Sequence, residues 1–275
     1  MAAKLPAPPA AVLRVIRELQ ASAREERPLV VAGAPELASV LRRELARGGV
    51  AEAVREQGPL DGAAALVYVL AGAVDDEDRQ ILRAAEQARL PTVCVVAGPL
   101  GSGTPDLPFV LAENVIRVRS GAGFPLEEIA RTLARTLGEG ATPLAARLPV
   151  LRRPVCHELI RRAARQNAFV GAAVWIRGAD LPVLTLNQIR LVLRIADAHG
   201  FEVTAERVPE LLAVIGSGLG FRALARRTAL AVPVAGWAVR SLIAYAGTRA
   251  LGEAALRYFE RRVPVTRVAG ARARL

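Results

Sequence analysis

The chain has very few lysines, cysteines and aromatic residues. Lys4 is the only lysine among 37 basic residues, and aromatic residues make up 4% of the 275-residue sequence. Cys94 and Cys156 are the only cysteines, and each lies in an apolar stretch. The sequence therefore predicts no disulfide framework, no clustered metal site and no cofactor, and it favours a reducing, cytoplasmic environment.

Long uninterrupted hydrophobic runs are also missing. A helix that crosses a bilayer needs about 18 or more apolar residues without charges, and the longest candidate runs, 166–176, 211–221 and 228–239, are clearly shorter. Prolines and Arg14 interrupt the apolar residues of the N-terminus, so it does not have the apolar core of a secretory signal. We expect a cytoplasmic protein without a strict membrane-spanning helix.

Charge divides the chain into two parts. Residues 28–146 contain 11 basic and 15 acidic side chains, a net charge of −4, whereas residues 147–275 contain 21 and 8, a net charge of +13. A chain of this length is also expected to form two domains. The basic half indicates an anionic partner, either a membrane surface or a nucleic acid. An arginine-rich codon usage would explain the same excess without a partner.

Short β-branched runs alternate with helical patterns between residues 28 and 140. Such alternation is typical of βαβ units and predicts an α/β doubly wound parallel sheet, with any ligand bound at the carboxyl ends of the strands. The predicted strands are 29–34, 64–72, 92–98 and 115–119, and the predicted helices are 36–47, 76–89 and 126–137.

The remaining chain is predicted to be helical. Residues 1–27 form an amphipathic N-terminal arm that docks on its own domain, and residues 141–153, which contain two prolines, form a linker. An all-α helical domain is predicted over 154–262, followed by a basic tail over 263–275. The predicted helices of this domain are 155–176, 185–199, about 205–230 and 234–261.

The helix over 185–200 has the clearest end signals. Thr185 and Gln188 form a capping-box pattern at its start, and Gly200 supplies a left-handed end. Its polar residues form one narrow stripe, so we expect the helix to be buried on most sides. The stripe consists of Asn187, Arg190, Arg194 and Asp197. Farther along, Gly216 and Gly220 have the G-x-x-x-G spacing of closely packed helices, but their glycine-rich run equally indicates a turn.

The order of parts over residues 28–140 resembles a small GTPase of the Era-like kind. That family has a phosphate loop, G-x-x-x-x-G-K-[ST], after the first strand, where this chain reads AGAPELASVLRREL and keeps only Gly33. The segments LAGAVDDEDRQ and AGPLGSGTPDLP lack the family's Asp-x-x-Gly and Asn-Lys-x-Asp motifs, and only VRSGAGFPLEEIARTL still resembles its counterpart. The resemblance implies a degenerate GTPase-like domain without the residues for GTP hydrolysis.

Residues 154–262 resemble the domain of unknown function family 697. The resemblance rests on the helix over 185–200, the tract 216–220, VPVAGW at 232–237 and AYAGTRALGEAALRYF at 244–259. That family accompanies Era-like GTPases and occurs in inner-membrane-associated bacterial proteins. It implies a helical module that associates with a membrane, and it implies no catalytic residues.

Candidate ligand-binding residues are few. Gly33, Ser120, Gly121 and Gly123 lie in turns before predicted helices, where backbone amides can bind an anion. The glycine-rich loop 98–103 could also bind a phosphate, but a plain surface connection is favoured there. The acidic run 75–78 could bind a metal ion, but acidic residues at a helix N-terminus also complement the helix dipole, and this interpretation is favoured. For catalysis, the candidates His157, His199, Cys94 and Cys156 are scattered along the sequence and form no recognisable constellation.

These observations favour a non-catalytic scaffold or adaptor at the cytoplasmic face of the membrane, peripheral to the inner membrane or partly inserted in it. The helical module would contact an anionic membrane surface or a protein partner, and it is also a candidate interface between copies of the chain. The alternatives are a soluble helical interaction module and a GTP-binding regulator with a non-standard site. A nucleic-acid partner is disfavoured because lysines and aromatic residues are scarce and no binding motif appears. The predicted contact residues are Arg222, Arg226, Arg227, Gly216, Gly220, Trp237 and Arg240.

Overall fold

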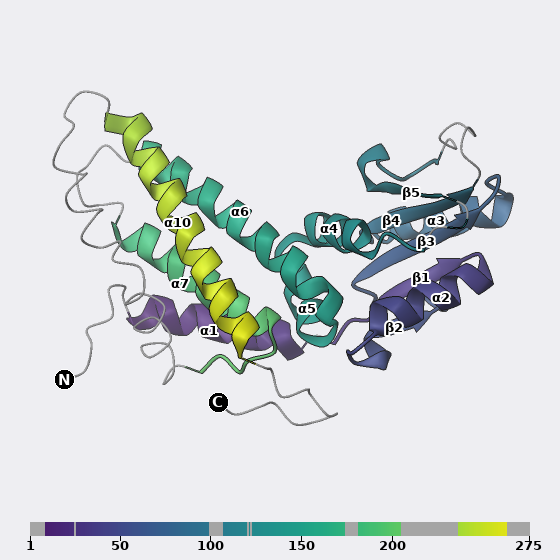
Figure 1. Cartoon of the computed structure of the whole chain (residues 1–275), viewed down its shortest axis with the longest axis horizontal. Coiled ribbons are helices and arrows are strands. Elements are labelled where there is room, and N and C mark those ends of the chain that lie inside the picture. Colours follow the sequence, from purple (N-terminus) through teal and green to yellow (C-terminus); the bar gives the residue numbers. More distant parts are fainter. Residues whose placement is uncertain are drawn as a thin grey trace. The chain divides into compact units, whose positions relative to one another are not determined.

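The computed structural model describes residues 9–24, 26–98, 107–119, 121, 123–173, 181–204 and 236–262 (Figure 1). They belong to two compact units, an α/β unit over Glu25–Val155 and a helical unit built from the described parts of Met1–Arg24 and Cys156–Leu275. The division falls inside the long helix α6 (Pro149–Ala173).

A five-stranded, all-parallel sheet forms the core of the α/β unit (Figure 1). The strand order is β2-β1-β3-β4-β5, one of the two common orders of doubly wound sheets. The predicted parallel α/β fold is thus confirmed, and a short strand, β2, is added to the four predicted ones. The strands are β1 (Leu29–Gly33), β2 (Val54–Glu56), β3 (Ala65–Ala71), β4 (Thr92–Gly98) and β5 (Val115–Arg119).

Helices cover both faces of this sheet. The connection from β1 to β2 through α2 (Pro35–Ala46) runs in the opposite direction to the one from β3 to β4 through α3 (Asp76–Gln87). Because parallel crossovers are right-handed, α2 and α3 lie on opposite faces. A further helix, α4 (Leu126–Leu137), packs against β4. The central strands are buried on both faces, which explains why they appear in the sequence as continuous apolar runs rather than alternating ones.

The acidic run at 75–78 caps α3. The Asp75 side chain accepts a hydrogen bond from the Asp78 backbone amide at 2.8 Å, and the Asp78 side chain accepts one from the Asp75 amide at 2.9 Å. Asp78 Oδ1 also accepts a hydrogen bond from the hydroxyl of buried Tyr68, with 2.7 Å between the two oxygens. The favoured capping interpretation is confirmed. No group of three or more potential metal-ligating side chains occurs in the part of the chain that the structure describes.

We predict that the α/β unit loses stability at alkaline pH, because it buries the thiol of Cys94 and the phenol hydroxyl of Tyr68. Burial, with a smaller contribution from Asp78, raises the pKa of the Cys94 thiol from 9.0 to about 12. Burial and then the hydrogen bond to Asp78 raise the pKa of Tyr68 above its ordinary value of 10.0. Each group favours its protonated form in the folded state, so its stabilising contribution is complete below the unfolded-state pKa and is lost at higher pH.

We therefore expect a constant free energy of unfolding from pH 7 to about pH 8.5, and a decline from pH 9 to 12 of up to about 1.4 kcal/mol per pH unit for each group. Denaturant unfolding followed by circular dichroism over this range is the measurement. Tyr68→Phe should make the free energy of unfolding decline less steeply with pH above pH 10, because Tyr68 is the only tyrosine of the α/β unit. Equal slopes in the wild type and Tyr68→Phe would contradict the prediction.

The segment predicted as a linker is helical and buried. Residues 138–141 form a short 3-10 helix, α5 spans Thr142–Arg147, and α6 begins at Pro149. Its prolines stand at helix starts, where the missing amide proton is tolerated. Leu144, Leu148 and Leu151 are at most 1% exposed, and the Arg147 carbonyl accepts a hydrogen bond from the Val50 amide at 3.0 Å. Burial of its leucines overrides the local proline signal, and residues 141–153 belong to the α/β unit, which ends at Val155.

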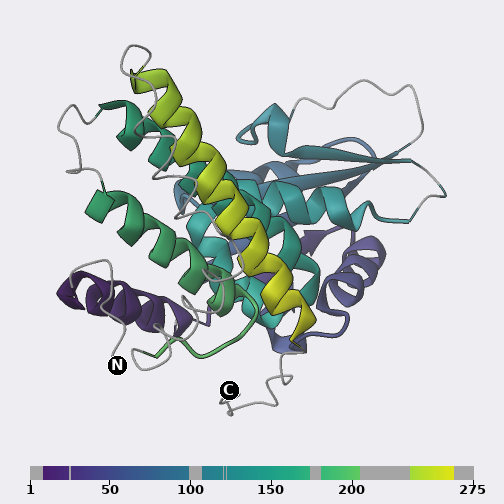
Figure 2. The same ribbon diagram turned by 60° about the vertical axis from the view of Figure 1, so that its left-hand side comes forward.

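The helical unit contains α1 (Pro9–Arg24), α6, α7 (Leu181–Ala198) and α10 (Gly236–Arg261). Figure 2 shows α1 alongside α7, against which its apolar face packs. Glu18 forms ion pairs with Arg190 and Arg194, the latter at 3.2 Å, and the Gln20 amide donates to the Val203 carbonyl at 3.0 Å. The arm therefore docks on the helical unit and not on the sheet that follows it in sequence.

For α7, the predicted C-terminal end is confirmed and the predicted start is not. Gly200 has a φ of 84°, and the amides of Gly200 and Phe201 bond to the carbonyls of Asp197 and Ala196, which is a Schellman motif. The predicted start is wrong, because the helix already begins at Leu181 and Thr185 lies inside it. Residues 191–200 are all buried, as expected for a helix surrounded on most sides.

Candidate functional site

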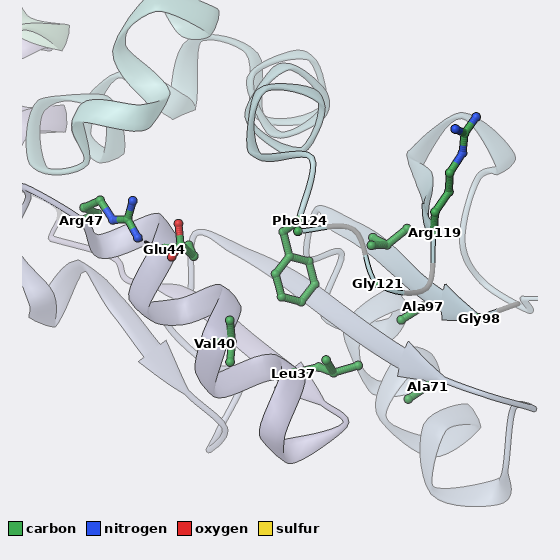
Figure 3. A pocket seen from close by; sticks show the side chains of 12 residues that line it. Leu37, Val40, Glu44, Arg47, Ala71, Ala97, Gly98, Arg119, Gly121 and Phe124 are labelled. Carbon is green, nitrogen blue, oxygen red and sulfur yellow. Dashed lines mark hydrogen bonds and ion pairs between the residues drawn. The ribbon is translucent and has the colours of Figure 1, made fainter.

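A hollow of about 680 Å³ lies in the α/β unit at the carboxyl ends of β3, β4 and β5 (Figure 3). Ligands of doubly wound sheets bind at this edge, so the predicted location of a ligand site coincides with a real concavity. The hollow is lined by Leu37, Val40, Glu44, Arg47, Ala71, Ala97, Gly98, Val118, Arg119, Gly121, Gly123 and Phe124.

Gly33 does not line this hollow, but it positions one of its walls. Its φ is +103°, and a Cβ atom there would lie 2.0 Å from the Val69 carbonyl oxygen. The next amide, of Ala34, donates to the same oxygen at 2.8 Å. The chain can therefore turn tightly from β1 into α2, and α2 carries Leu37 and Val40 over the strand ends. The structure thus shows a packing role for Gly33, and anion binding by its backbone stays a prediction.

The helix N-termini beside the hollow are unfavourable for phosphate. Helix α2 begins with Pro35, which has no amide proton, and has Glu36 in its first turn. Helix α4 follows Pro125 and has Glu127 and Glu128 in its first turn. Carboxylates at these positions already complement the positive ends of the helix dipoles and repel further negative charge. The predicted residues Gly121 and Gly123 do line the hollow, whereas Ser120 lies outside the described residues.

The hollow combines an apolar surface with one uncompensated positive charge. In Figure 3 the Phe124 ring reaches toward the α2 side chains Leu37 and Val40. Arg47 is paired with Glu44 at 2.5 Å. The Arg119 side chain is exposed at the end of β5, and in Figure 3 its guanidinium points away from Phe124 and α2. No other described residue forms a side-chain hydrogen bond or an ion pair with it. The prediction from sequence missed Arg119, although its place at the end of a predicted strand was a usable signal.

The helical unit brings together Cys156 and His199, which are scattered in the sequence. Their Sγ and Nδ1 atoms are 3.9 Å apart. His199 Nδ1 also lies 2.8 Å from the Ile195 carbonyl oxygen, to which it donates, and the imidazole stacks on Phe259 with ring centroids 6.0 Å apart. Cys156 is 0% and His199 4% exposed. A ring nitrogen that donates to a carbonyl cannot take a proton from the thiol, so this pair is a packing contact rather than a nucleophile and its base.

A buried polar layer joins α6, α7 and α10. The Asn167 amide donates to the Thr248 hydroxyl oxygen at 2.8 Å, and Asn187 donates to the Asn167 carbonyl oxygen at 2.8 Å. Gln188 approaches the same Thr248 oxygen at 3.5 Å. Asn167 and Thr248 are both 0% exposed. Asn187 was expected in a polar stripe, but its partners lie on other helices and were not predicted from the sequence.

Among the described residues of the helical unit, large apolar side chains are exposed at one end of this layer. Helix α6 runs antiparallel to α10, since Ile160 approaches Gly252 while Asn167 meets Thr248. It is also antiparallel to α7, since Cys156 approaches His199 while Asn167 meets Asn187. Residues after 167 in α6 and before 187 in α7 and 248 in α10 therefore share one end, which we call the open end. Its exposed apolar side chains are Phe169 (74%), Val183 (47%) and Leu242 (66%).

Most residues predicted to contact a membrane or partner fall outside the described structure. These are Gly216, Gly220, Arg222, Arg226 and Arg227. Trp237 and Arg240 lie in the first two turns of α10, but their side chains are not described. None of the helices in the described part of the chain is long and apolar enough to cross a membrane. Contact through these residues stays a prediction.

Comparison with known proteins gives no relative: no protein-family model, no curated protein and no solved structure matches this chain.

Proposed function

We propose that this chain is a non-catalytic scaffold that docks on an anionic membrane surface through the open end of its helical unit. The observation that carries the proposal is the exposure of Phe169, Val183 and Leu242, which stand on three different helices at that end. Exposed apolar side chains are ordinary when single, and contiguous apolar patches mark interaction sites. We infer that these three side chains, which stand at the same end of three helices, contribute to one such site.

The sequence adjoining the open end has the composition of a membrane interface. In the sequence, Trp175 follows α6 by two residues and Trp237 is the second residue of α10. Tryptophan is enriched at membrane–water interfaces. Residues 211–235, which lead into α10, contain three arginines and no acidic residue. Apolar and aromatic side chains bordered by arginine are typical of segments that bind anionic lipids.

The test is co-sedimentation with vesicles of phosphatidylglycerol and of phosphatidylcholine across a salt series, together with tryptophan emission spectra. We expect binding to phosphatidylglycerol, weakening as salt increases, with a blue shift of the emission. Phe169→Glu combined with Leu242→Glu should weaken binding at least tenfold, because burying one large apolar side chain contributes roughly 1.5–3 kcal/mol.

Leu111→Glu is the matched control. Leu111 is 66% exposed, as Leu242 is, but it belongs to the α/β unit, so this variant should bind as the wild type does. Equal binding by the wild type and the Phe169/Leu242 variant would overturn the proposal. A dimer that forms through the open end in sedimentation experiments, without vesicle binding, would also overturn it in favour of an interface between copies.

A further inference from the structure

The hollow in the α/β unit has the size and lining of a small-molecule site. Its volume of about 680 Å³ lies within the range of about 300–1,000 Å³ that is typical of such sites. Most of its lining side chains are apolar, including Leu37, Val40, Val118 and Phe124. An occupant therefore gains most from burying an apolar group against α2 and the strand ends.

The charges around the hollow select an anion of low charge. Arg119 supplies a positive charge that no described residue neutralises, whereas the charge of Arg47 is already matched by Glu44. The exposed Arg119 side chain points away from Phe124 in Figure 3, but it is free to turn toward the hollow, where a single carboxylate can accept a charge-assisted hydrogen bond from its guanidinium. A triphosphate would need several backbone donors, and the nearby helix starts offer prolines and the carboxylates of Glu36 and Glu127 instead.

We propose that the hollow binds a small amphipathic molecule with one negatively charged group, in which the apolar part lies between α2 and Phe124 and the charged group contacts Arg119. This site is separate from the proposed membrane-docking surface, which belongs to the helical unit.

Isothermal titration of the full chain with decanoate, below the concentration at which it forms micelles, tests the proposal. Decanol, which lacks the charge, acetate, which lacks the apolar chain, and GTP are titrated in parallel. We expect decanoate to bind at least tenfold more tightly than the other three. Arg119→Gln should weaken decanoate binding about tenfold, as expected for the loss of one hydrogen bond to a charged group, and should leave decanol binding unchanged.

Three further variants make the test specific. Arg131→Gln removes an exposed arginine of α4 that does not line the hollow, and it should leave decanoate binding unchanged. Val40→Glu places a negative charge in the lining at a side chain that is already 40% exposed, and it should weaken decanoate binding. Phe169→Glu should have no effect, because it alters only the open end. Undiminished decanoate binding by Arg119→Gln, or tighter binding of GTP than of decanoate, would overturn the proposal.

Discussion

Gly33→Ala is expected to lower the free energy of unfolding of the α/β unit by about 3 kcal/mol or more. The added Cβ atom would lie 2.0 Å from the Val69 carbonyl oxygen, at a φ of +103° that L-residues rarely adopt. This oxygen cannot move away without cost, because it accepts a hydrogen bond from the Ala34 amide at 2.8 Å and belongs to the central strand β3. Alanine would therefore force β1 and β3 apart at the edge that carries the hollow.

Gly72→Ala is the matched control for this substitution. Gly72 follows β3 directly and has a φ of +119°, but nothing lies within 4 Å of its missing Cβ atom. Gly72→Ala should lower the free energy of unfolding by only about 1–2 kcal/mol, the cost of placing alanine at a positive φ. Hydrogen exchange of the β1 and β3 amides measures both effects within the α/β unit. Equal losses of protection in the two variants would show that the contact with Val69 is unimportant.

Thr248→Val should destabilise the helical unit by about 2–3 kcal/mol, although valine has nearly the same shape as threonine. The Thr248 hydroxyl oxygen accepts a hydrogen bond from Asn167 at 2.8 Å, and both residues are 0% exposed. In the variant the Asn167 amide would remain buried without this acceptor. Denaturant unfolding followed by tryptophan fluorescence is suitable, because both tryptophans lie in the part of the sequence assigned to the helical unit.

Two further variants separate the hydroxyl group from other effects. Thr248→Ser keeps the hydroxyl, so its loss in the free energy of unfolding should be less than half of the loss in Thr248→Val. Thr185→Val makes the same substitution on α7 at a half-buried position whose side chain forms no hydrogen bond with any described residue, so its effect should stay within about 0.5 kcal/mol. A Thr248→Val variant as stable as the wild type would show that the polar layer contributes little to stability.

Local signals in the sequence were sufficient for much of the fold. The strands were found because buried parallel strands are continuous β-branched runs, and the end of α7 was found because only a left-handed residue such as Gly200 completes a Schellman motif without strain. The start of α3 was indicated by its acidic first turn. In each case the physical cause lies within a few residues of the signal, so neighbouring residues are enough to reveal it.

Features set by distant residues were missed. Strand β2 has only three residues, and its pairing with β1 defines it. The partner of the N-terminal arm and the burial of residues 141–153 depend on contacts with other elements. The order of strands and helices that resembles a GTPase is shared by many doubly wound domains. It does not specify the sheet order, which places β3 between β1 and β4.

In the candidate site too, residues with a local sequence signal were found and those set by distant contacts were missed. Gly121 and Gly123 were identified from their turn and do line the hollow, whereas Arg119 was not singled out among the many arginines of the chain. The contact between Cys156 and His199 spans 43 residues, and the one between Asn167 and Thr248 spans 81. Side chains this far apart in sequence meet only through helix packing, and neither composition nor periodicity specifies which helix faces which.

The docking of α1 on α7 has a consequence for synthesis on the ribosome. Glu18 and Arg194 form an ion pair across 176 residues of chain. At about 5–20 residues per second, α1 emerges on the order of 10–35 s before its partner helix. The contiguous α/β unit can fold during this interval, while the apolar face of α1 at Val12, Ile16 and Leu19 stays accessible to chaperones and proteases. A chain whose translation stops before α7 therefore keeps an exposed apolar helix by which quality control can distinguish it from a finished one.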